Sequence, residues 1–175
     1  MTPSNQSHSH KPESSDDAAL KKTVILGVGN LLLSDEGVGV HVANKLMKMD
    51  LPSHVQVVEG GTGGFRLMDV VAGAGRLIVV DAVKRGGPPG SIYRFNIKDA
   101  PTHQDAYRTS VHQIGILAMI RLSEHVGEAP ETTIIGVEPK SMDVGMDLTP
   151  DVQARVPEII AMILEEIGHP AKDHA

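Results

Sequence analysis

The apolar positions of residues 23–167 follow two alternating patterns. Short runs that are apolar throughout, such as residues 77–80 (LIVV), predict buried strands whose two faces are both covered. Longer stretches with apolar residues at helical spacing predict amphipathic helices. Strands are expected at residues 23–27, 55–58, 77–80, 91–96 and 132–137, and helices at residues 37–49, 65–72 and 112–126, with a last helix that starts at residues 149–151.

The order of these elements predicts the fold class. Strands and helices alternate along most of the chain, which favours parallel strands joined by helical crossovers. We therefore expect an α/β fold with three α-β-α layers, in which a mostly parallel, twisted sheet of about five strands carries helices on both faces. Residues 91–96 (SIYRFN) alternate between apolar and polar, which is typical of an edge strand with one wetter face.

The last predicted helix has a clear start and an internal proline. Thr149 suits the N-cap position, and Pro150 suits the first turn, where its missing N–H costs nothing. Pro157 falls inside the apolar stripe of the same helix, so we expect a kink there.

The 175-residue chain has the length of one domain. Residues 1–21 are rich in Ser, Asp, His and Lys and lack periodicity, which predicts a disordered N-terminal extension. Residues 22–168 are expected to form a single α/β domain, and residues 169–175 a frayed C-terminal tail.

Composition narrows the classes of function. A net charge of −6 argues against nucleic acid and anionic membranes as partners. The chain has no cysteine, which excludes disulfides, thiolate metal ligands and a cysteine nucleophile. No apolar run is long enough to span a bilayer, and the N-terminus has no apolar segment typical of a secretion signal, so a cytoplasmic location is expected.

Three polar residues follow predicted strands at the edge of the sheet where open α/β proteins bind ligands: Glu36, Asp81 and His112. Each has an ordinary alternative explanation. Glu36 and His112 lie near helix starts, and Asp81, which we expect to be exposed at the sheet edge, could cap a turn. Together they form a set of two carboxylates and one imidazole, which suits a divalent metal such as nickel, zinc or iron.

The Gly27-x-Gly29 pair also invites a dinucleotide-binding hypothesis. The full fingerprint needs a third glycine, where this chain has Leu32. The loop continues into Asp35 and Glu36, whose carboxylates would repel a pyrophosphate. Nucleotide binding is therefore disfavoured.

Seven motifs follow one another along the chain: residues 26–32 (LGVGNLL), 35–39 (DEGVG), 60–62 (GGT), 79–82 (VVDA), 110–113 (SVHQ), 135–139 (IGVEP) and 148–150 (LTP). Taken together, these motifs resemble the hydrogenase maturation proteases over roughly residues 22–167. In this family, endopeptidases remove the C-terminal extension of the large subunit of nickel–iron hydrogenase after nickel has been inserted. The second loop of the family often has Asp before its glycines, where this chain has Glu59.

The resemblance implies that Glu36, Asp81 and His112 are the metal-binding and catalytic residues. It also implies that the partner is the nickel-loaded precursor of the hydrogenase large subunit, so that the substrate supplies the nickel. Zinc or cadmium is expected to substitute in vitro. The nucleophile is expected to be water, with Asp81 or Glu36 as the base in addition to its role as a ligand. Residues 60–62 are expected to let the substrate backbone approach closely, and Asn30 to orient its loop or donate to a carbonyl.

Two other classes of function fit parts of the pattern. A phosphoryl-accepting receiver domain also has an acidic cluster after its first strand, an Asp after its third and a Lys near its fifth, which Asp81 and Lys140 imitate. His112 has no role in such a domain. A non-catalytic maturation chaperone that only holds nickel is the other alternative.

Overall fold

A computed structural model describes residues 22–63, 67–97, 108–109, 120 and 129–168. The predictions for residues 1–21, residues 169–175 and the helix over 112–126 concern parts of the chain outside these ranges. The strands are β1 (Thr23–Val28), β2 (Val55–Gly61), β3 (Arg76–Lys84), β4 (Ile92–Asn96), β5 (Arg108–Thr109) and β6 (Glu131–Val137). The helices are the 3-10 turn η1 (Ser34–Gly37), α1 (Val38–Leu46), α2 (Met68–Ala72), α4 (Pro150–Gln153) and α5 (Val156–Glu166).

Five strands form a continuous sheet in the order β2-β1-β3-β6-β4. The pairs β1–β2, β1–β3 and β3–β6 are parallel, whereas β4 runs antiparallel to β6. The short strand β5 pairs antiparallel with the last residues of β3. This confirms the predicted α/β class, the mostly parallel sheet and the position of β4 at an edge.

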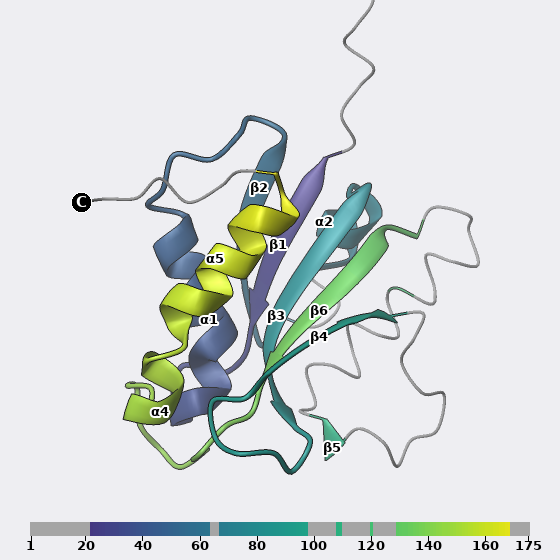
Figure 1. Ribbon diagram of the computed structural model, residues 1–175. Helices are drawn as coiled ribbons and strands as arrows, with labels where there is room; N and C mark the ends of the chain where they lie inside the picture. Colours follow the sequence, from purple (N-terminus) through teal and green to yellow (C-terminus); the bar gives the residue numbers. More distant parts are fainter. Residues whose placement is uncertain (1–21, 64–66, 98–107, 110–119, 121–128, 169–175) are drawn as a thin grey trace, which may run out of the picture.

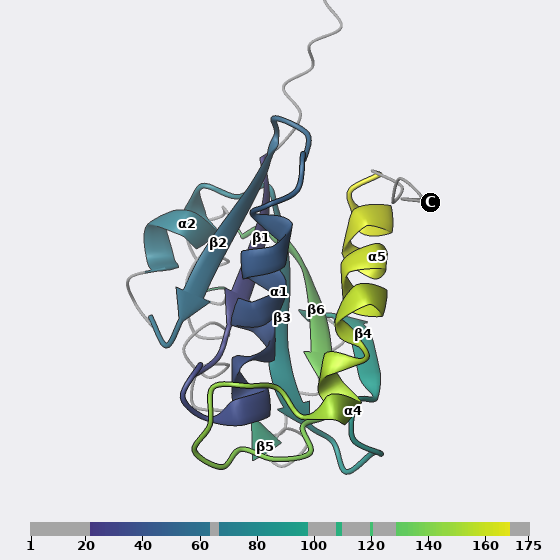
Figure 2. The same ribbon diagram turned by 90° about the vertical axis from the view of Figure 1, so that its left-hand side faces the viewer.

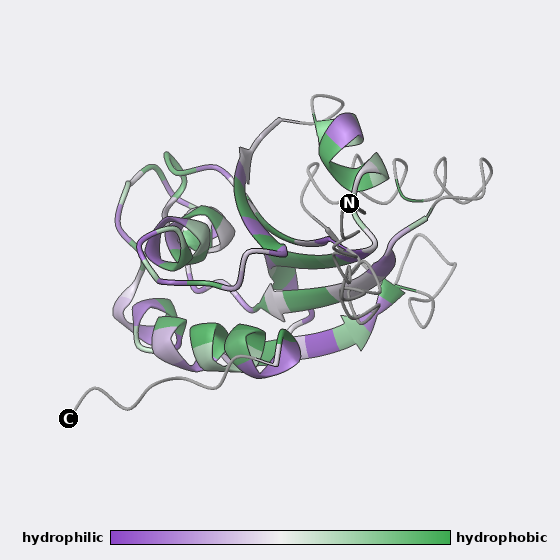
Figure 3. Ribbon diagram, turned by 90° about the horizontal axis from the view of Figure 1, so that it is seen from above, coloured by the Kyte–Doolittle hydropathy of each residue, from purple (hydrophilic) through white to green (hydrophobic). Residues whose placement is uncertain are grey.

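Helices cover both faces of the sheet (Figure 1). Helices α1 and α5 lie side by side on one face, with α4 below them, and α2 lies on the other, as the two further views show (Figures 2 and 3). Two apolar clusters fill the spaces between these layers. The cluster under α1 and α5 includes Val42, Ile78, Ile135 and Ile159, and the cluster under α2 includes Leu26, Val71, Leu77 and Ile120. Among the described residues, no helix combines the length and apolarity needed to cross a membrane.

Glycines bring α1 unusually close to the sheet. A Cβ on Gly27 would lie 2.1 Å from the carbonyl oxygen of Gly39, and one on Gly39 would lie 2.1 Å from that of Val80. Both contacts are too short for any side chain, so these positions require glycine for packing. This packing accounts for Gly27, one of the two glycines that suggested a dinucleotide-binding loop.

The C-terminal helical region is divided rather than kinked. Helix α4 ends at Gln153, and Pro157 lies in the first turn of the separate helix α5. The prediction of one helix with a kink at Pro157 is therefore wrong. Pro157 instead lies in the first turn of a new helix, where its missing N–H costs no hydrogen bond. The predicted apolar stripe still faces the core, since Val152, Val156 and Ile163 are all buried.

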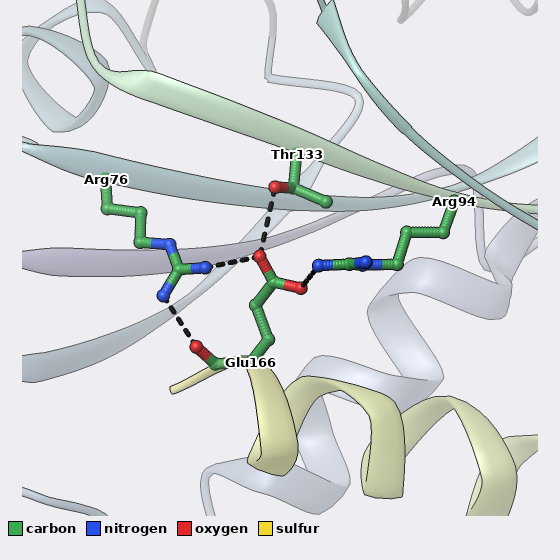
Figure 4. A network of polar contacts seen from close by, with 4 residues as sticks. All are labelled: Arg76, Arg94, Thr133 and Glu166. Carbon is green, nitrogen blue, oxygen red and sulfur yellow. Dashed lines mark hydrogen bonds and ion pairs between the residues drawn. The ribbon is translucent and has the colours of Figure 1, made fainter. Parts of the chain in front are cut away.

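The carboxylate of Glu166, at the end of α5, joins this helix to three strands (Figure 4). It forms ion pairs with Arg76 of β3 and Arg94 of β4 and accepts a hydrogen bond from the Thr133 hydroxyl of β6 at 3.2 Å. Arg76 also donates to the backbone carbonyl of Glu166 at 2.6 Å. Burial raises the pKa of Glu166, but Arg94 and Arg76 outweigh this effect and hold the pKa below its ordinary value.

Replacing Glu166 with Gln should lower the free energy of unfolding by about 1–3 kcal/mol near neutral pH, because charged hydrogen bonds are lost. The folded pKa is lowered, so the carboxylate stabilises the fold above the ordinary glutamate pKa and loses this effect as the pH falls through the folded value. The stability gap between wild type and E166Q should therefore shrink in acid. Chemical denaturation across a pH series measures it.

The neighbouring Glu165 is exposed and provides the matched control. E165Q should change stability by less than about 0.5 kcal/mol. Equal losses in both variants, or a gap that widens in acid, would contradict the assigned network.

Candidate functional site

The candidate site lies at the carboxyl ends of β1 and β3, where the chain leaves the sheet. Glu36 lies on η1, the turn that follows the β1 loop, and η1 contacts β3. Both Glu36 and Asp81 are buried, and Asp81 is 0% exposed. Acids near the carboxyl ends of parallel strands lie where open α/β proteins bind ligands, so this pair indicates a functional site.

Asp81 does not end its strand. Strand β3 continues to Lys84, so the prediction that Asp81 closes the strand and is exposed at the sheet edge is wrong. The reason is that β3 outlasts its pairing with β1, which stops at Val80, and continues along β6, where Asp81 lies opposite Gly136. One oxygen of the Asp81 carboxylate accepts the N–H of Ala82 at 2.8 Å.

The packing of α1 brings Glu36 and Asp81 to the same region. Gly39, in the first turn of α1, lies directly against the backbone of Val80. Glu36 is one turn before Gly39, and Asp81 is the next residue after Val80. The two predicted carboxylates therefore flank a single backbone contact.

The third predicted ligand, His112, lies outside the described residues. Within the part of the chain that the structure describes, no group of three or more His, Asp or Glu side chains is placed to hold a metal ion. The structure thus brings together the two predicted carboxylates and leaves the complete set of three as a prediction.

Asp35 is buried beside Glu36 and has a structural role that sequence patterns did not reveal. Its carboxylate accepts hydrogen bonds from the backbone N–H groups of Lys140 (2.8 Å), Ser141 (3.1 Å) and Thr149 (2.7 Å), and from the Thr149 hydroxyl (2.9 Å). The Thr149 hydroxyl is thereby directed at Asp35 instead of capping α4, which has no side-chain cap bond. Asp35 anchors residues 140–149 against η1.

Glu138, directly after β6, organises the turn between β3 and β4 in the same manner. Its carboxylate accepts the N–H groups of Arg85 (2.8 Å) and Gly86 (3.2 Å) and the hydroxyl of Tyr93 (2.9 Å). Burial raises the pKa of Glu138, but these donors outweigh it and the pKa lies below its ordinary value. The motif at residues 135–139 contained this acid, but its partners come from distant parts of the chain.

The glycines at residues 60–61 form a bulge at the end of β2. The register between β1 and β2 shifts here, since Gly27 pairs with Glu59 and Val28 with Gly61. The carbonyl of Gly61 accepts the N–H of Gly29 at 3.0 Å. A Cβ on Gly61 would meet nothing within 4 Å, and its φ of +49° favours glycine. The bulge therefore ties the two loops together and leaves open space beside Gly61.

The loop that leads to η1 is built by its own residues. The side-chain oxygen of Asn30 accepts the N–H of Leu32 at 3.0 Å, which forms a tight turn. Ser34 has a positive φ of 44°, and its hydroxyl donates to the carbonyl of Asp143 at 3.1 Å. Asn30 thus orients this loop, which agrees with one of its two predicted roles.

The receiver-domain alternative is not supported. The ammonium of Lys140 lies 2.7 Å from the carboxylate of Asp151, on α4, and is paired there. That ion pair raises the pKa of Lys140 through the hydrogen bond to Asp151. The lysine that imitated a receiver's phosphate-contacting residue is therefore engaged by α4.

An open α/β sheet with buried acids at the carboxyl ends of adjacent strands defines a class of α/β proteins whose ligands bind beside those strand ends. Comparison with known families is more specific. The family model for hydrogenase maturation proteases matches residues 40–166, more than half of the chain. The chain belongs to the hydrogenase maturation protease family, and is therefore a peptide hydrolase by family.

Comparisons with individual relatives support the same family. The chain is 38% identical over 148 residues to the hydrogenase expression/formation protein HupD of Thiocapsa roseopersicina, covering 83% of this chain and 67% of that protein. It is 32% identical over 146 residues to the hydrogenase 2 maturation protease of Escherichia coli (82% and 88% covered). The structure of the hydrogenase maturating endopeptidase HybD from E. coli superposes with a TM-score of 0.75 at 33% identity, covering 84% of this chain and 94% of that one.

Replacing Asp35 with Asn should lower the free energy of unfolding by about 2–3 kcal/mol, because the amide offers one acceptor where the carboxylate serves four bonds. Amide hydrogen exchange at residues 140–149 should also accelerate. The exposed Asp50 is the matched control, and D50N should change neither quantity. Unchanged exchange in D35N would show that this loop is held by other contacts.

Proposed function

We propose that the chain is a nickel-dependent endopeptidase that removes the C-terminal extension of the nickel–iron hydrogenase large subunit after nickel insertion. Membership of the maturation protease family supports the type of reaction and the kind of partner. The observation that carries the site is the pair of buried carboxylates, Glu36 on η1 and Asp81 within β3, near the carboxyl ends of the adjacent strands β1 and β3.

Nickel enters this proposal as part of the substrate. Glu36 and Asp81 offer carboxylate oxygens, and His112 offers an imidazole nitrogen. Such ligands can add to a nickel ion that the precursor already holds through thiolates, but they compete poorly with thiolates for it. Cleavage then depends on metallation of the precursor, because only a nickel-loaded precursor completes the site.

Water is the nucleophile in this proposal, since the sequence has no cysteine and no serine in a recognisable nucleophile elbow. One of the two carboxylates takes a proton from that water as its oxygen attacks the carbonyl carbon of the scissile bond. The same proton then passes to the departing amine, which leaves a new carboxyl end on the large subunit. His112 serves as a ligand in this scheme, and either Asp81 or Glu36 serves as the base.

The bulge at Gly60 and Gly61 provides a place for the substrate backbone. Gly61 has open space where a side chain would stand, and it lies at the end of the edge strand β2. An extended peptide can approach glycine backbone more closely than any other residue. This supports the predicted role of residues 60–62 in holding the segment to be cut.

Changing Asp81 to Asn or Glu36 to Gln should lower the rate of precursor cleavage at least about 100-fold, because each change removes a ligand and a possible base. His112→Ala should lower the cleavage rate similarly, because it removes a predicted metal ligand but no base. Cleavage of purified nickel-loaded precursor, followed by mass spectrometry, measures this. Asp69 is exposed on α2, on the other face of the sheet, and D69N should cleave at the wild-type rate.

The same experiment distinguishes the proposal from a nickel-holding chaperone. A chaperone would bind the nickel-loaded precursor and leave its extension intact. A protease of the proposed kind should cut the nickel-loaded precursor and leave the nickel-free precursor uncut. Equal cleavage of both forms would refute the proposed role of nickel.

Titration of nickel, zinc or cadmium into the free protein should reveal a weak site, because two carboxylates and one imidazole leave the coordination incomplete. Isothermal calorimetry measures it in a variant in which His8 and His10 are replaced by Ala, so that these two histidines cannot contribute. Binding should disappear when Glu36, Asp81 and His112 are also replaced. Persistent binding would place the metal elsewhere.

A further inference from the structure

Three large apolar side chains are exposed on two loops next to the candidate site. Leu32 is 59% exposed, Val144 is 90% exposed and Met146 is 64% exposed. Leu32 belongs to the loop between β1 and η1, and the other two belong to the segment that Asp35 anchors. We call these three side chains the Leu32 patch.

Backbone hydrogen bonds join the two loops directly. The N–H of Gly145 donates to the carbonyl of Leu32 at 3.0 Å, and the N–H of Ser34 donates to the carbonyl of Gly145 at 2.7 Å. Leu33 and Gly145 form an isolated parallel bridge. Leu32 and Val144 directly precede the two bridged residues, so the parallel pairing places these two exposed residues next to each other.

The patch is held in place by the fold. The carboxylate of Asp35 anchors both ends of residues 140–149, and the side chain of His41, on α1, donates to the carbonyl of Met146 at 3.1 Å. Because these bonds hold the loop in one conformation, the exposure of its apolar side chains is a fixed feature of the surface. Exposed apolar groups that adjoin one another on an ordered surface generally mark a binding site.

The position and the charge of the surroundings indicate the occupant. The loop that carries Leu32 leads directly into η1, which carries Glu36 four residues later, so the patch adjoins the candidate site. Asp143 and Asp147 are exposed on either side of Val144 and Met146, and the chain carries a net charge of −6. A partner that complements this surface presents apolar side chains flanked by Lys or Arg.

We infer that the Leu32 patch is a docking surface for the folded precursor of the hydrogenase large subunit, through an apolar segment of that precursor with basic residues beside it. This inference rests on the proposed function for the identity of the partner. The patch positions the precursor so that its extension reaches Glu36 and Asp81, and it contributes to binding whether or not the precursor carries nickel.

The test combines cleavage with direct binding. The patch variant carries Leu32→Ser, Val144→Ser and Met146→Ser, and the control carries Met47→Ser and Met49→Ser. Met47 and Met49 are 47% and 40% exposed just after α1, which runs back toward the amino ends of the strands. Binding of nickel-loaded and nickel-free precursor is measured by surface plasmon resonance, with every variant also carrying Asp81→Asn so that cleavage does not interfere. Cleavage is measured without that substitution.

The patch variant should bind both forms of the precursor about tenfold more weakly than its parent, since exposed apolar anchors dominate such contacts. KM for cleavage should rise by a similar factor while kcat stays within about twofold, because uniform binding is lost and the reacting groups are unchanged. The control should match wild type in every measurement. Raising the salt concentration should weaken wild-type binding through Asp143 and Asp147.

The outcomes separate this inference from the proposed function. Normal cleavage with unchanged KM and binding in the patch variant overturns the docking surface and leaves the protease intact. Binding through the patch without cleavage by the wild type refutes the protease and retains the docking surface. A wild type that neither binds nor cleaves the precursor overturns both. A patch variant that alters only the concentration-dependent self-association of the chain shows that a second copy occupies the surface, which also overturns the inference.

Discussion

The carboxylate of Asp35 joins parts of the chain that are more than 100 residues apart, and the local geometry of the site depends on this connection. A buried negative charge without partners would be costly, and here backbone N–H groups from residues 140–149 surround it. Most of residues 140–149 lies outside helices and strands, so these N–H groups have no hydrogen-bond partners from regular secondary structure. The acid and the loop therefore stabilise each other, and η1, with Glu36 on it, is fixed as a result.

Two other acids, Glu138 and Glu166, also join separate elements of the fold through hydrogen bonds and ion pairs. Glu138 holds the β3–β4 turn by accepting backbone N–H groups, and Glu166 joins α5 to the strands through Arg76 and Arg94. Both have a pKa below the ordinary value, because their donors outweigh the effect of burial. Glu166 stabilises the amino ends of β3 and β6, whereas Asp35 and Glu138 lie near the carboxyl ends. These three fold-stabilising acids are distinct from Glu36 and Asp81, the two buried carboxylates assigned to the candidate site.

Local hydrophobic patterning predicted the five strands of the main sheet and the edge position of β4, and the order of the elements predicted the parallel arrangement. It did not predict how far β3 extends, since Lys84 is held in the sheet by pairing with Arg108 and Asp81 by pairing opposite Gly136, and both partners are remote in sequence. The burial of Asp81 follows from the same long-range pairing. Glu36 and Asp81 were identified from their places after strands, but Asp35 was not separated from Glu36, because its role is defined by donors that arrive from residues 140–149.

The glycine contacts between α1 and the sheet have a consequence for the mechanical behaviour of the site. With Gly27 against Gly39 and Gly39 against Val80, backbone touches backbone and no flexible side chain lies between them. Helix α1 cannot slide or tilt there without steric conflict, so η1 and β3 move as one rigid body. Any adjustment to an incoming substrate must then come from the surrounding loops, while the separation between Glu36 and Asp81 stays constant.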